Sequence, residues 1–346
     1  MEKDKILLIG LAGIGDAVLS SAAIRNLRQN HPDSFISILT FPAPGQILQK
    51  SPYLDKVFIL HKGLRGVLSG LLLFKQLRNL HFDVVVNLKQ HHTRRGMVNM
   101  ILLLKAIAAK KSLGRNTDGK GFFYDMKIED TINTQRRDTE YMLDLMHKLD
   151  CQINDKQLEV WFDDNDLARV RQLLEKNGVL QKDILVGINP EARRPSHRWD
   201  WKNFAEVAEE LSARYKMRVV ITGTKQAAGL AKKISGRMSV KPLDLCGKLS
   251  LTQLIPLIRR CNVYISGDTA PMHIANALKT PLAAIMGPGI MKTAPYQEEN
   301  CIILRKQVDC WPCYKFRCKH MKCLKIITPN EVIAAASSLL KDYVKD

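Results

Sequence analysis

Asp16 closes a glycine-rich turn at a position where a carboxylate can take part in catalysis. Residues 5–10 form an apolar run that predicts a buried strand, and Gly13 and Gly15 lead from it into a predicted helix. A carboxylate at the carboxyl end of such a strand faces the ligand crevice, where it can accept a proton from a substrate hydroxyl. The alternative interpretation makes Asp16 only a helix N-terminal residue that the helix dipole stabilises.

The same turn does not match two common nucleotide-binding motifs. No Gly-Lys-Ser/Thr follows it, so it is not a P-loop. Val18 stands where a dinucleotide fingerprint needs its third glycine, and the second strand ends in Thr40 and Phe41 where an acidic residue should bind ribose. The glycines therefore serve a tight turn and a close backbone approach to a ligand.

A basic loop follows the first strand that we expect in the second half of the chain. The predicted strand 183–188 leads into Arg193, Arg194, His197 and Arg198. Arginine side chains donate paired hydrogen bonds to phosphate oxygens, so this cluster can surround a diphosphate. A solvated basic loop is the alternative, and the position at a strand end favours the binding role.

The segment 266–273 is a polar turn between a predicted strand and a predicted helix. Pro271 suits the first turn of a helix, and the free N–H groups there can bind phosphate. Asp268 repels phosphate, so its expected partner is a sugar hydroxyl, while His273 can face the anion. In the alternative interpretation, Asp268 or Thr269 is a helix cap and His273 is a core residue.

Cys310, Cys313, Cys318 and Cys323 form a cluster with the spacing C-x2-C-x4-C-x4-C. Four thiolates can hold a structural zinc ion, and in the cytosol a metal or free thiols are expected rather than disulfides. Only C-x2-C is a common zinc spacing, and the loops are short for an enclosed site. A structural zinc site and a metal-free staple or acceptor-facing loop therefore both remain open.

The predicted elements alternate between strands and helices in both halves of the chain, apart from the polar stretch 116–137, which shows no clear periodicity. This order is typical of parallel sheets covered by helices. The fold class is therefore α/β, with a linker at 151–164. We expect two doubly wound Rossmann-like domains, 1–165 and 166–327, and a C-terminal helix in 328–346 that can pack back on the first domain.

Composition and charge restrict the class of protein. The chain has 346 residues, of which 46% are apolar and 25% charged, values that exclude a disordered or fibrous protein. The formal net charge of +19 favours an anionic partner, which can be nucleic acid, a phosphorylated small molecule or a membrane surface. Much of that charge is local, because residues 89–115 include seven Lys or Arg and no acidic residue.

No apolar run approaches the ~20 residues that span a bilayer. Residues 6–14 loosely resemble a signal peptide, but Glu2, Asp4 and Asp16 fit a buried strand better. We therefore expect a cytoplasmic protein.

Taken in order, these segments resemble glycosyltransferase family 9, the ADP-heptose:lipopolysaccharide heptosyltransferases. The resemblance spans residues 5–340 and is most specific in the stretch Asp-Thr-x-Pro-Met-His at 268–273. The turn at Asp16, the 189–204 stretch, the 246–251 segment, the Gly-Pro turn at 287–288 and the cysteine-rich tail also match.

The resemblance implies a GT-B fold, with two Rossmann-like domains that face a cleft. It implies inverting, metal-independent transfer of a heptose from ADP-heptose to the lipopolysaccharide inner core, by a cytoplasmic enzyme that is peripheral on the inner face of the inner membrane. The resemblance also implies that catalysis requires no cofactor, and on this interpretation we expect no nucleic acid to be bound. The domain 1–165 is then the acceptor side, and 166–327 binds the nucleotide sugar.

Residue roles carry over position by position. Asp16 resembles the general base that deprotonates the acceptor hydroxyl. Positions assigned to donor binding are Arg193, Arg194, His197, Arg198, Leu249, Asp268, Thr269, Ala270 and His273, with Leu249 near the adenine. Positions assigned to the acceptor side are Gly13, Gly15, Lys89, Arg94 and Arg95.

Two positions depart from the family pattern. His197 stands where the family commonly has Lys, and Ala270 where it usually has Gly. These departures favour, as an alternative, a GT-B enzyme with another nucleotide sugar or acceptor glycan. A noncatalytic protein that binds nucleic acid through its net charge is the third hypothesis, although no known nucleic-acid module is present.

Overall fold

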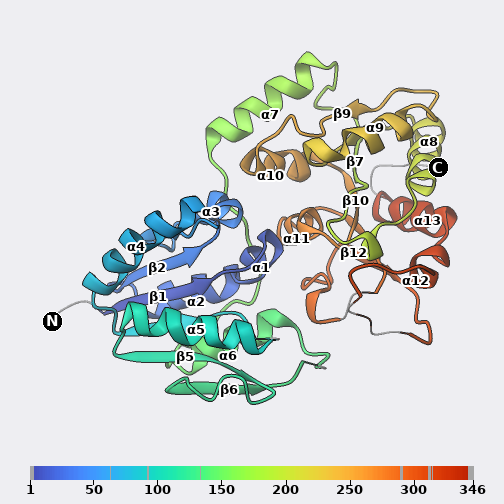
Figure 1. Cartoon of the computed structure of the whole chain (residues 1–346). Coiled ribbons are helices and arrows are strands. Elements are labelled where there is room, and N and C mark those ends of the chain that lie inside the picture. The colour runs from blue at the N-terminus through green and yellow to red at the C-terminus, as the bar shows by residue number, and fades with distance from the viewer. Residues whose placement is uncertain are drawn as a thin grey trace. The chain divides into compact units, whose positions relative to one another are not determined.

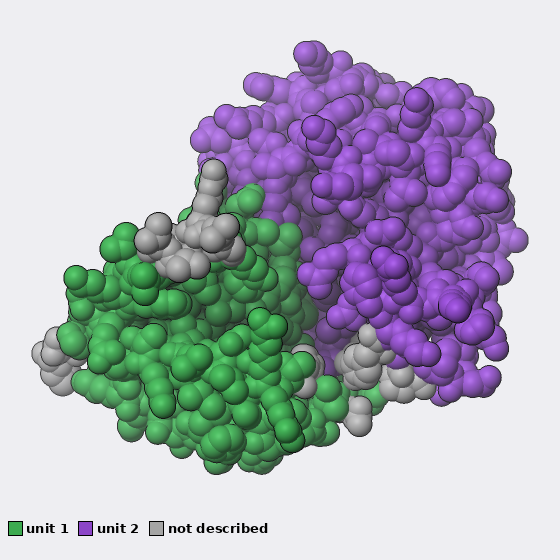
Figure 2. Space-filling view, viewed as in Figure 1, with its two compact units in different colours: residues 1–161 green, residues 162–346 purple. Residues whose placement is uncertain are grey.

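The computed structural model describes residues 4–62, 64–91, 93–132, 134–288, 291–310, 313 and 315–341. The chain forms two compact units, residues 1–161 and 162–346, which Figure 2 shows in different colours. The boundary lies inside the predicted linker 151–164, slightly ahead of the division that we expected after residue 165.

The first unit is built on a six-stranded parallel sheet with the order β3-β2-β1-β4-β5-β6 (Figure 1). The chain reverses its direction of growth across the sheet between β1 and β4, as in doubly wound folds. The strands are β1 Lys5–Gly10, β2 Phe35–Thr40, β3 Lys56–Ile59, β4 Val84–Asn87, β5 Lys111–Thr117 and β6 Met126–Asp130. The helices are α1 Ile14–Leu19, α2 Ser21–Asn30, α3 Pro42–Leu48, α4 Leu64–Asn79, α5 Arg94–Ile107 and α6 Asp138–His147.

Helices cover both faces of this sheet. Consecutive residues of a strand point to opposite faces, yet residues 6–9 of β1 are all buried. On one face, Leu7 and Ile9 belong to a core cluster with Leu77 of α4 and Ile107 of α5. Burial of such side chains stabilises the unit by about 1.5–3 kcal/mol each.

The second unit repeats this architecture with the order β12-β11-β10-β7-β8-β9. Its strands are β7 Leu185–Asn189, β8 Arg218–Ile221, β9 Leu243–Asp244, β10 Val263–Gly267, β11 Leu282–Met286 and β12 Cys301–Arg305. Its α-helices are α7 Asp164–Lys176, α8 Trp201–Tyr215, α9 Ala228–Ser235, α10 Leu251–Arg260, α11 Ala270–Ala277, α12 Lys322–Lys325 and α13 Pro329–Leu339. Short 3-10 turns are η1 Pro195–His197, η2 Lys225–Ala227 and η3 Met291–Thr293.

The two parallel sheets confirm the predicted α/β class, and three details add to it. The stretch 116–137, which lacks a periodic pattern, contains the end of β5 and all of β6. Pro256 lies inside α10 without ending it. α13 packs against α8 and β11 of its own unit, and its predicted return to the first unit stays a prediction. Residues 342–346 of the predicted C-terminal helix lie outside the described residues.

In the described part of the chain, no helix is both long enough and apolar enough to cross a membrane.

Candidate active site

Asp16 lies in the first turn of α1, directly after the carboxyl end of β1. Its Oδ2 accepts a hydrogen bond from the backbone N–H of Gly13 at 2.8 Å, so the carboxylate caps the helix that carries it. A Cβ on Gly13 would lie 3.3 Å from the same oxygen, which explains why a glycine suits this position. Gly15 is half-buried inside α1. Capping fixes the Asp16 side chain and leaves its second oxygen for another partner.

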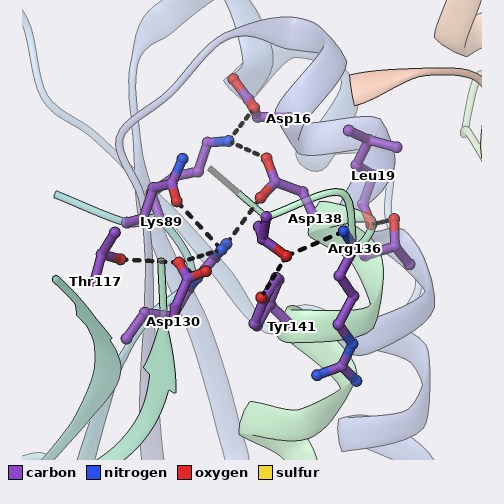
Figure 3. Close-up of polar contacts among 12 residues, drawn as sticks. Asp16, Leu19, Lys89, Thr117, Asp130, Arg136, Asp138 and Tyr141 are labelled. Carbon is purple, nitrogen blue, oxygen red and sulfur yellow. Dashed lines mark hydrogen bonds and ion pairs between the residues drawn. The ribbon is translucent and has the colours of Figure 1, made fainter. Parts of the chain in front are cut away.

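The second oxygen of Asp16 begins a chain of alternating charges (Figure 3). Lys89, just after β4, places its Nζ 2.5 Å from Asp16 Oδ1 and 3.1 Å from Asp138 Oδ2. The other oxygen of Asp138 accepts from Arg115 Nη1 at 2.8 Å. Arg115 then donates through Nη2 and Nε to Asp130 Oδ2, at 2.6 and 3.0 Å. Three carboxylates and two cations thus connect α1, α6, β5, β6 and the end of β4.

Exposure decreases along this chain from Asp16 inward. The Asp16 and Lys89 side chains are 27% and 23% exposed, whereas those of Arg115 and Asp130 are fully buried. The Arg115 guanidinium also stacks over the Tyr141 ring, with its carbon 4.1 Å from the ring centroid. The buried end is therefore a rigid anchor, and Asp16 is the end that solvent or a ligand can reach.

Lys89 stays protonated and positively charged in this arrangement. Burial of its ammonium group alone would lower its pKa, but the Asp16 and Asp138 carboxylates outweigh that effect and raise the pKa above the usual value. Lys89 is therefore a charged partner of the two carboxylates. Its predicted contact with the acceptor stays a prediction.

Arg94 and Arg95 differ from Lys89, because both are exposed in the first turn of α5. The Thr93 hydroxyl caps this helix by accepting from the Gly96 N–H at 3.1 Å. These two arginines are therefore available to an anion in solution, as their predicted acceptor-side role requires.

In the second unit, the structure brings two predicted motifs into direct contact. His197 ends η1 in the loop after β7, and Asp268 follows β10. His197 Nδ1 lies 3.0 Å from Asp268 Oδ2, and the two side chains are only 9% and 11% exposed. The contact arises because β7 and β10 are neighbouring parallel strands, so their carboxyl ends meet. The residue that replaces the family lysine thus pairs with the expected sugar-binding carboxylate.

The remaining residues of the 266–273 turn open helix α11. Thr269 occupies the N-cap position, Ala270 is the first helical residue, and Pro271 follows it. His273 is buried in the first turns of this helix. The start of α11 therefore follows Asp268 directly in the chain, and the predicted binding of a diphosphate by its N–H groups stays a prediction.

The basic loop divides into exposed and anchored residues. Arg193 and Arg198 are exposed and Arg194 is half-buried. Arg198 Nε donates to the backbone carbonyl of Ala192 at 2.8 Å, which holds the loop in shape. Buried Trp199 fixes the end of the loop by donating to the carbonyl of Ile327 at 3.0 Å.

Comparison with known proteins identifies the family of this chain. The family model "Glycosyltransferase family 9 (heptosyltransferase)" matches residues 71–324. The chain belongs to glycosyltransferase family 9. It is 26% identical over 336 residues to lipooligosaccharide heptosyltransferase 2 of Campylobacter jejuni, with 95% of this chain and 96% of that protein covered. It is 29% identical over 346 residues to lipopolysaccharide heptosyltransferase 3 of Escherichia coli K12, with 95% and 96% covered.

Solved structures support the GT-B fold of this family 9 glycosyltransferase. A family 9 glycosyl transferase from Veillonella parvula superposes with a TM-score of 0.82 at 23% identity, covering 99% of both chains. This likeness confirms the predicted fold class, and the family model confirms the predicted family.

Leu249 and the cysteine cluster lie elsewhere in the second unit. Leu249 is half-buried immediately before Ser250, which caps α10. The four cysteines of the cluster all line one cavity of about 140 Å³, together with Ser196 and His320. Among the described residues, no group of three or more His, Cys, Asp or Glu side chains is arranged to hold a metal ion. The structural zinc site and the metal-free staple or acceptor-facing loop therefore both stay predictions.

The cysteine-rich segment is hydrogen-bonded to the basic loop. Ser196 Oγ donates to the carbonyl of Lys315 at 2.7 Å, and its N–H donates to that of Phe316 at 3.3 Å. Ser196 precedes His197, so this segment supports the turn that carries the histidine.

Removal of Arg115 tests how far the first unit depends on the buried charges. We expect Arg115→Met to lower the free energy of unfolding by about 3–5 kcal/mol, because it removes the cation that pairs with buried Asp130 and leaves Asp138 with Lys89 alone as its cation. Arg136→Met is the matched control, since Arg136 pairs with Asp144 at the surface and its loss should cost less than about 1 kcal/mol. Urea unfolding at neutral pH measures both, and equal losses would contradict the assignment.

Proposed function

We propose that this chain is an inverting heptosyltransferase that moves a heptose from ADP-heptose to the lipopolysaccharide inner core. The observation that carries the proposal is the family 9 match, together with named heptosyltransferases that align with this chain over nearly their whole length. The two clusters at strand ends supply the groups that such a transfer needs.

On the acceptor side, Asp16 acts as the general base. The acceptor hydroxyl gives its proton to Asp16 while its oxygen forms a bond to the anomeric carbon of the heptose. Lys89 and the Gly13 N–H each engage one carboxylate oxygen, and each oxygen keeps a further lone pair for the hydroxyl. The ion-pair chain thus positions the base without saturating it.

On the donor side, the bond between the anomeric carbon and the diphosphate breaks, and ADP leaves with the bonding electrons. A single displacement inverts the anomeric centre. In this proposal the N-terminus of α11 and the cations Arg193, Arg194 and Arg198 stabilise the departing charge, so the reaction needs no catalytic metal. Asp268 contacts the sugar, and transfer requires that acceptor and donor reach one reaction centre.

A second candidate is a family 9 enzyme that uses another nucleotide sugar. The observation that favours it is the His197–Asp268 pair, because a lysine at this position would offer a different contact to the donor. The methyl group of Ala270 also leaves less room for a phosphate at the start of α11 than a glycine would.

Asp16→Asn tests the base. An amide cannot accept the proton, so we expect turnover to fall by about 100-fold or more while ADP-heptose binding survives. Asp33→Asn, at an exposed carboxylate of the same unit, is the control and should keep full activity. Initial rates with a truncated lipopolysaccharide acceptor, and calorimetric binding of the donor, measure the two effects. Normal turnover in Asp16→Asn would reject this assignment.

Lys89 variants test whether the cation positions that base. We expect Lys89→Met to lower kcat about ten-fold with little change in the KM for the donor, because Asp16 loses the partner of its Oδ1. Lys89→Arg keeps the charge and should recover most of the rate. Equal loss in both variants, in parallel with lost stability, would indicate a purely structural role.

The nucleotide preference separates the two candidate functions. ADP should raise the melting temperature more than UDP or GDP at equal concentration, because the nucleotide with the lowest Kd stabilises the folded state most. A ligand at 100 times its Kd stabilises the fold by about 2.7 kcal/mol. Excess EDTA should leave transfer unchanged. A larger shift with UDP or GDP would favour the second candidate.

A further inference from the structure

The donor-side residues described above leave the ribose of a nucleotide without a partner. In doubly wound folds with the strand order 3-2-1-4-5-6, an acidic residue after the second strand commonly binds the ribose hydroxyls. The second unit has this order, because its strands run β9-β8-β7-β10-β11-β12 when the sheet is followed from its other edge. β8 is therefore its second strand, yet residues 222–235, which follow β8, include no acidic residue.

A carboxylate reaches this strand end from the neighbouring loop. Glu191 lies two residues after β7, and its Oε2 and Oε1 accept hydrogen bonds from the backbone N–H and the hydroxyl of Thr224, both at 2.7 Å. The two loops meet because β7 and β8 are neighbouring parallel strands. Thr224 thus holds the Glu191 carboxylate at the place where such a fold usually has its ribose-binding acid.

A glycine at position 223 lets the two loops come this close. A Cβ there would lie 2.6 Å from the Cβ of Ala227, so the backbone at the end of β8 would have to shift. The same Cβ would contact Glu191 Oε2 at 3.4 Å. Glu191 is half-buried and Thr224 is exposed, so a ligand can reach the pair.

The bonding of Glu191 suits an uncharged ligand with hydroxyl groups. In the described part of the chain, no ion pair joins Glu191 to a cation, although three arginines follow it in the same loop. Each carboxylate oxygen accepts one hydrogen bond from Thr224 and keeps a further lone pair. Such a carboxylate repels phosphate, and it can accept hydrogen bonds from two adjacent hydroxyls, as the 2′,3′-diol of ribose offers.

The position of Glu191 also fits the order of the groups in a nucleotide sugar. Asp268, the expected partner of the sugar, follows β10, and the α11 turn expected at the diphosphate comes directly after it. Glu191 and Thr224 follow the next two strands, β7 and β8. Leu249, expected near the adenine, comes after β9, and its segment contacts the end of β8 through a hydrogen bond from the N–H of residue 247 to the carbonyl of residue 223 at 2.9 Å. The pair thus lies between the positions expected for diphosphate and base.

We propose that Glu191 binds the 2′- and 3′-hydroxyls of the donor ribose and makes the enzyme select ribonucleotides over 2′-deoxyribonucleotides. The inference rests on the proposed function only in taking a nucleotide sugar as the ligand. Thr224 orients the carboxylate before the ligand binds, so little ordering is needed on binding. The alternative role is a purely structural tie between two loops, which gives no discrimination between ribose and deoxyribose.

Calorimetric titration of the full chain with ADP and 2′-deoxy-ADP tests the proposal. We expect the unchanged protein to bind ADP at least about ten-fold more tightly, because 2′-deoxy-ADP lacks a hydrogen bond to a charged group. Glu191→Ala should bind both nucleotides with the same, lower affinity. Glu209→Ala is the matched control and should keep the preference, since Glu209 likewise accepts from the N–H and hydroxyl of one residue, Ser239, at 2.9 and 2.5 Å.

Glu191→Gln separates ribose binding from loop structure. It keeps an oxygen for the Thr224 N–H but loses the charge, so the preference for ADP should fall to about three-fold or less. If Glu191→Ala weakens both nucleotides in parallel and keeps their ratio, the role is structural and the proposal is wrong. An unchanged protein that does not distinguish the two nucleotides would also overturn it.

The comparison needs no glycosyl transfer. If UDP or GDP binds more tightly than ADP, the same titration with that nucleotide and its 2′-deoxy form tests the ribose contact, while the ADP-heptose donor is rejected. Failure of the ribose contact is therefore distinct from failure of the proposed function. A chain that binds none of the three nucleotides would contradict both.

Discussion

A guanidinium group lies entirely inside the first unit, and the structure of this unit depends on the neutralisation of its charge. A buried charge is tolerated only when it is paired and hydrogen-bonded, and Arg115 meets this condition with Asp130 on one side and Asp138 on the other. Asp138 also forms an ion pair with Lys89, and Lys89 forms a second ion pair with Asp16. The position of the exposed carboxylate is therefore set by charges deep in the unit, and the proposed chemistry at Asp16 rests on their geometry.

The sequence predicts those features that local patterns control. Apolar runs followed by polar turns locate the strand ends at Asp16, His197 and Asp268, and parallel α/β topology places such ends at one edge of each sheet. His197 and Asp268 are 71 positions apart by their numbers, yet they touch because β7 and β10 are neighbours. The spacing of residues does not indicate the class of donor and acceptor, which the family resemblance implies.

The sequence does not predict the features that need several elements at once. Asp130 and Asp138 lie in or beside a stretch without periodicity, and their common partner Arg115 lies in β5, a strand of mostly polar residues. Nothing local indicates that a basic residue in a strand is buried, because burial depends on carboxylates from β6 and α6. The charge of Lys89 is visible in the sequence, while its two carboxylate partners are not, and its predicted contact with the acceptor stays a prediction.

The end of the first unit also has a consequence for biosynthesis. Buried Arg25 of α2 is hydrogen-bonded to Glu159, and Asn26 donates to the carbonyl of Asp155, so the last residues of this unit close over one of its first helices. The unit is continuous in sequence. During vectorial synthesis α2 therefore stays uncovered on that side until residues 155–159 have left the ribosome.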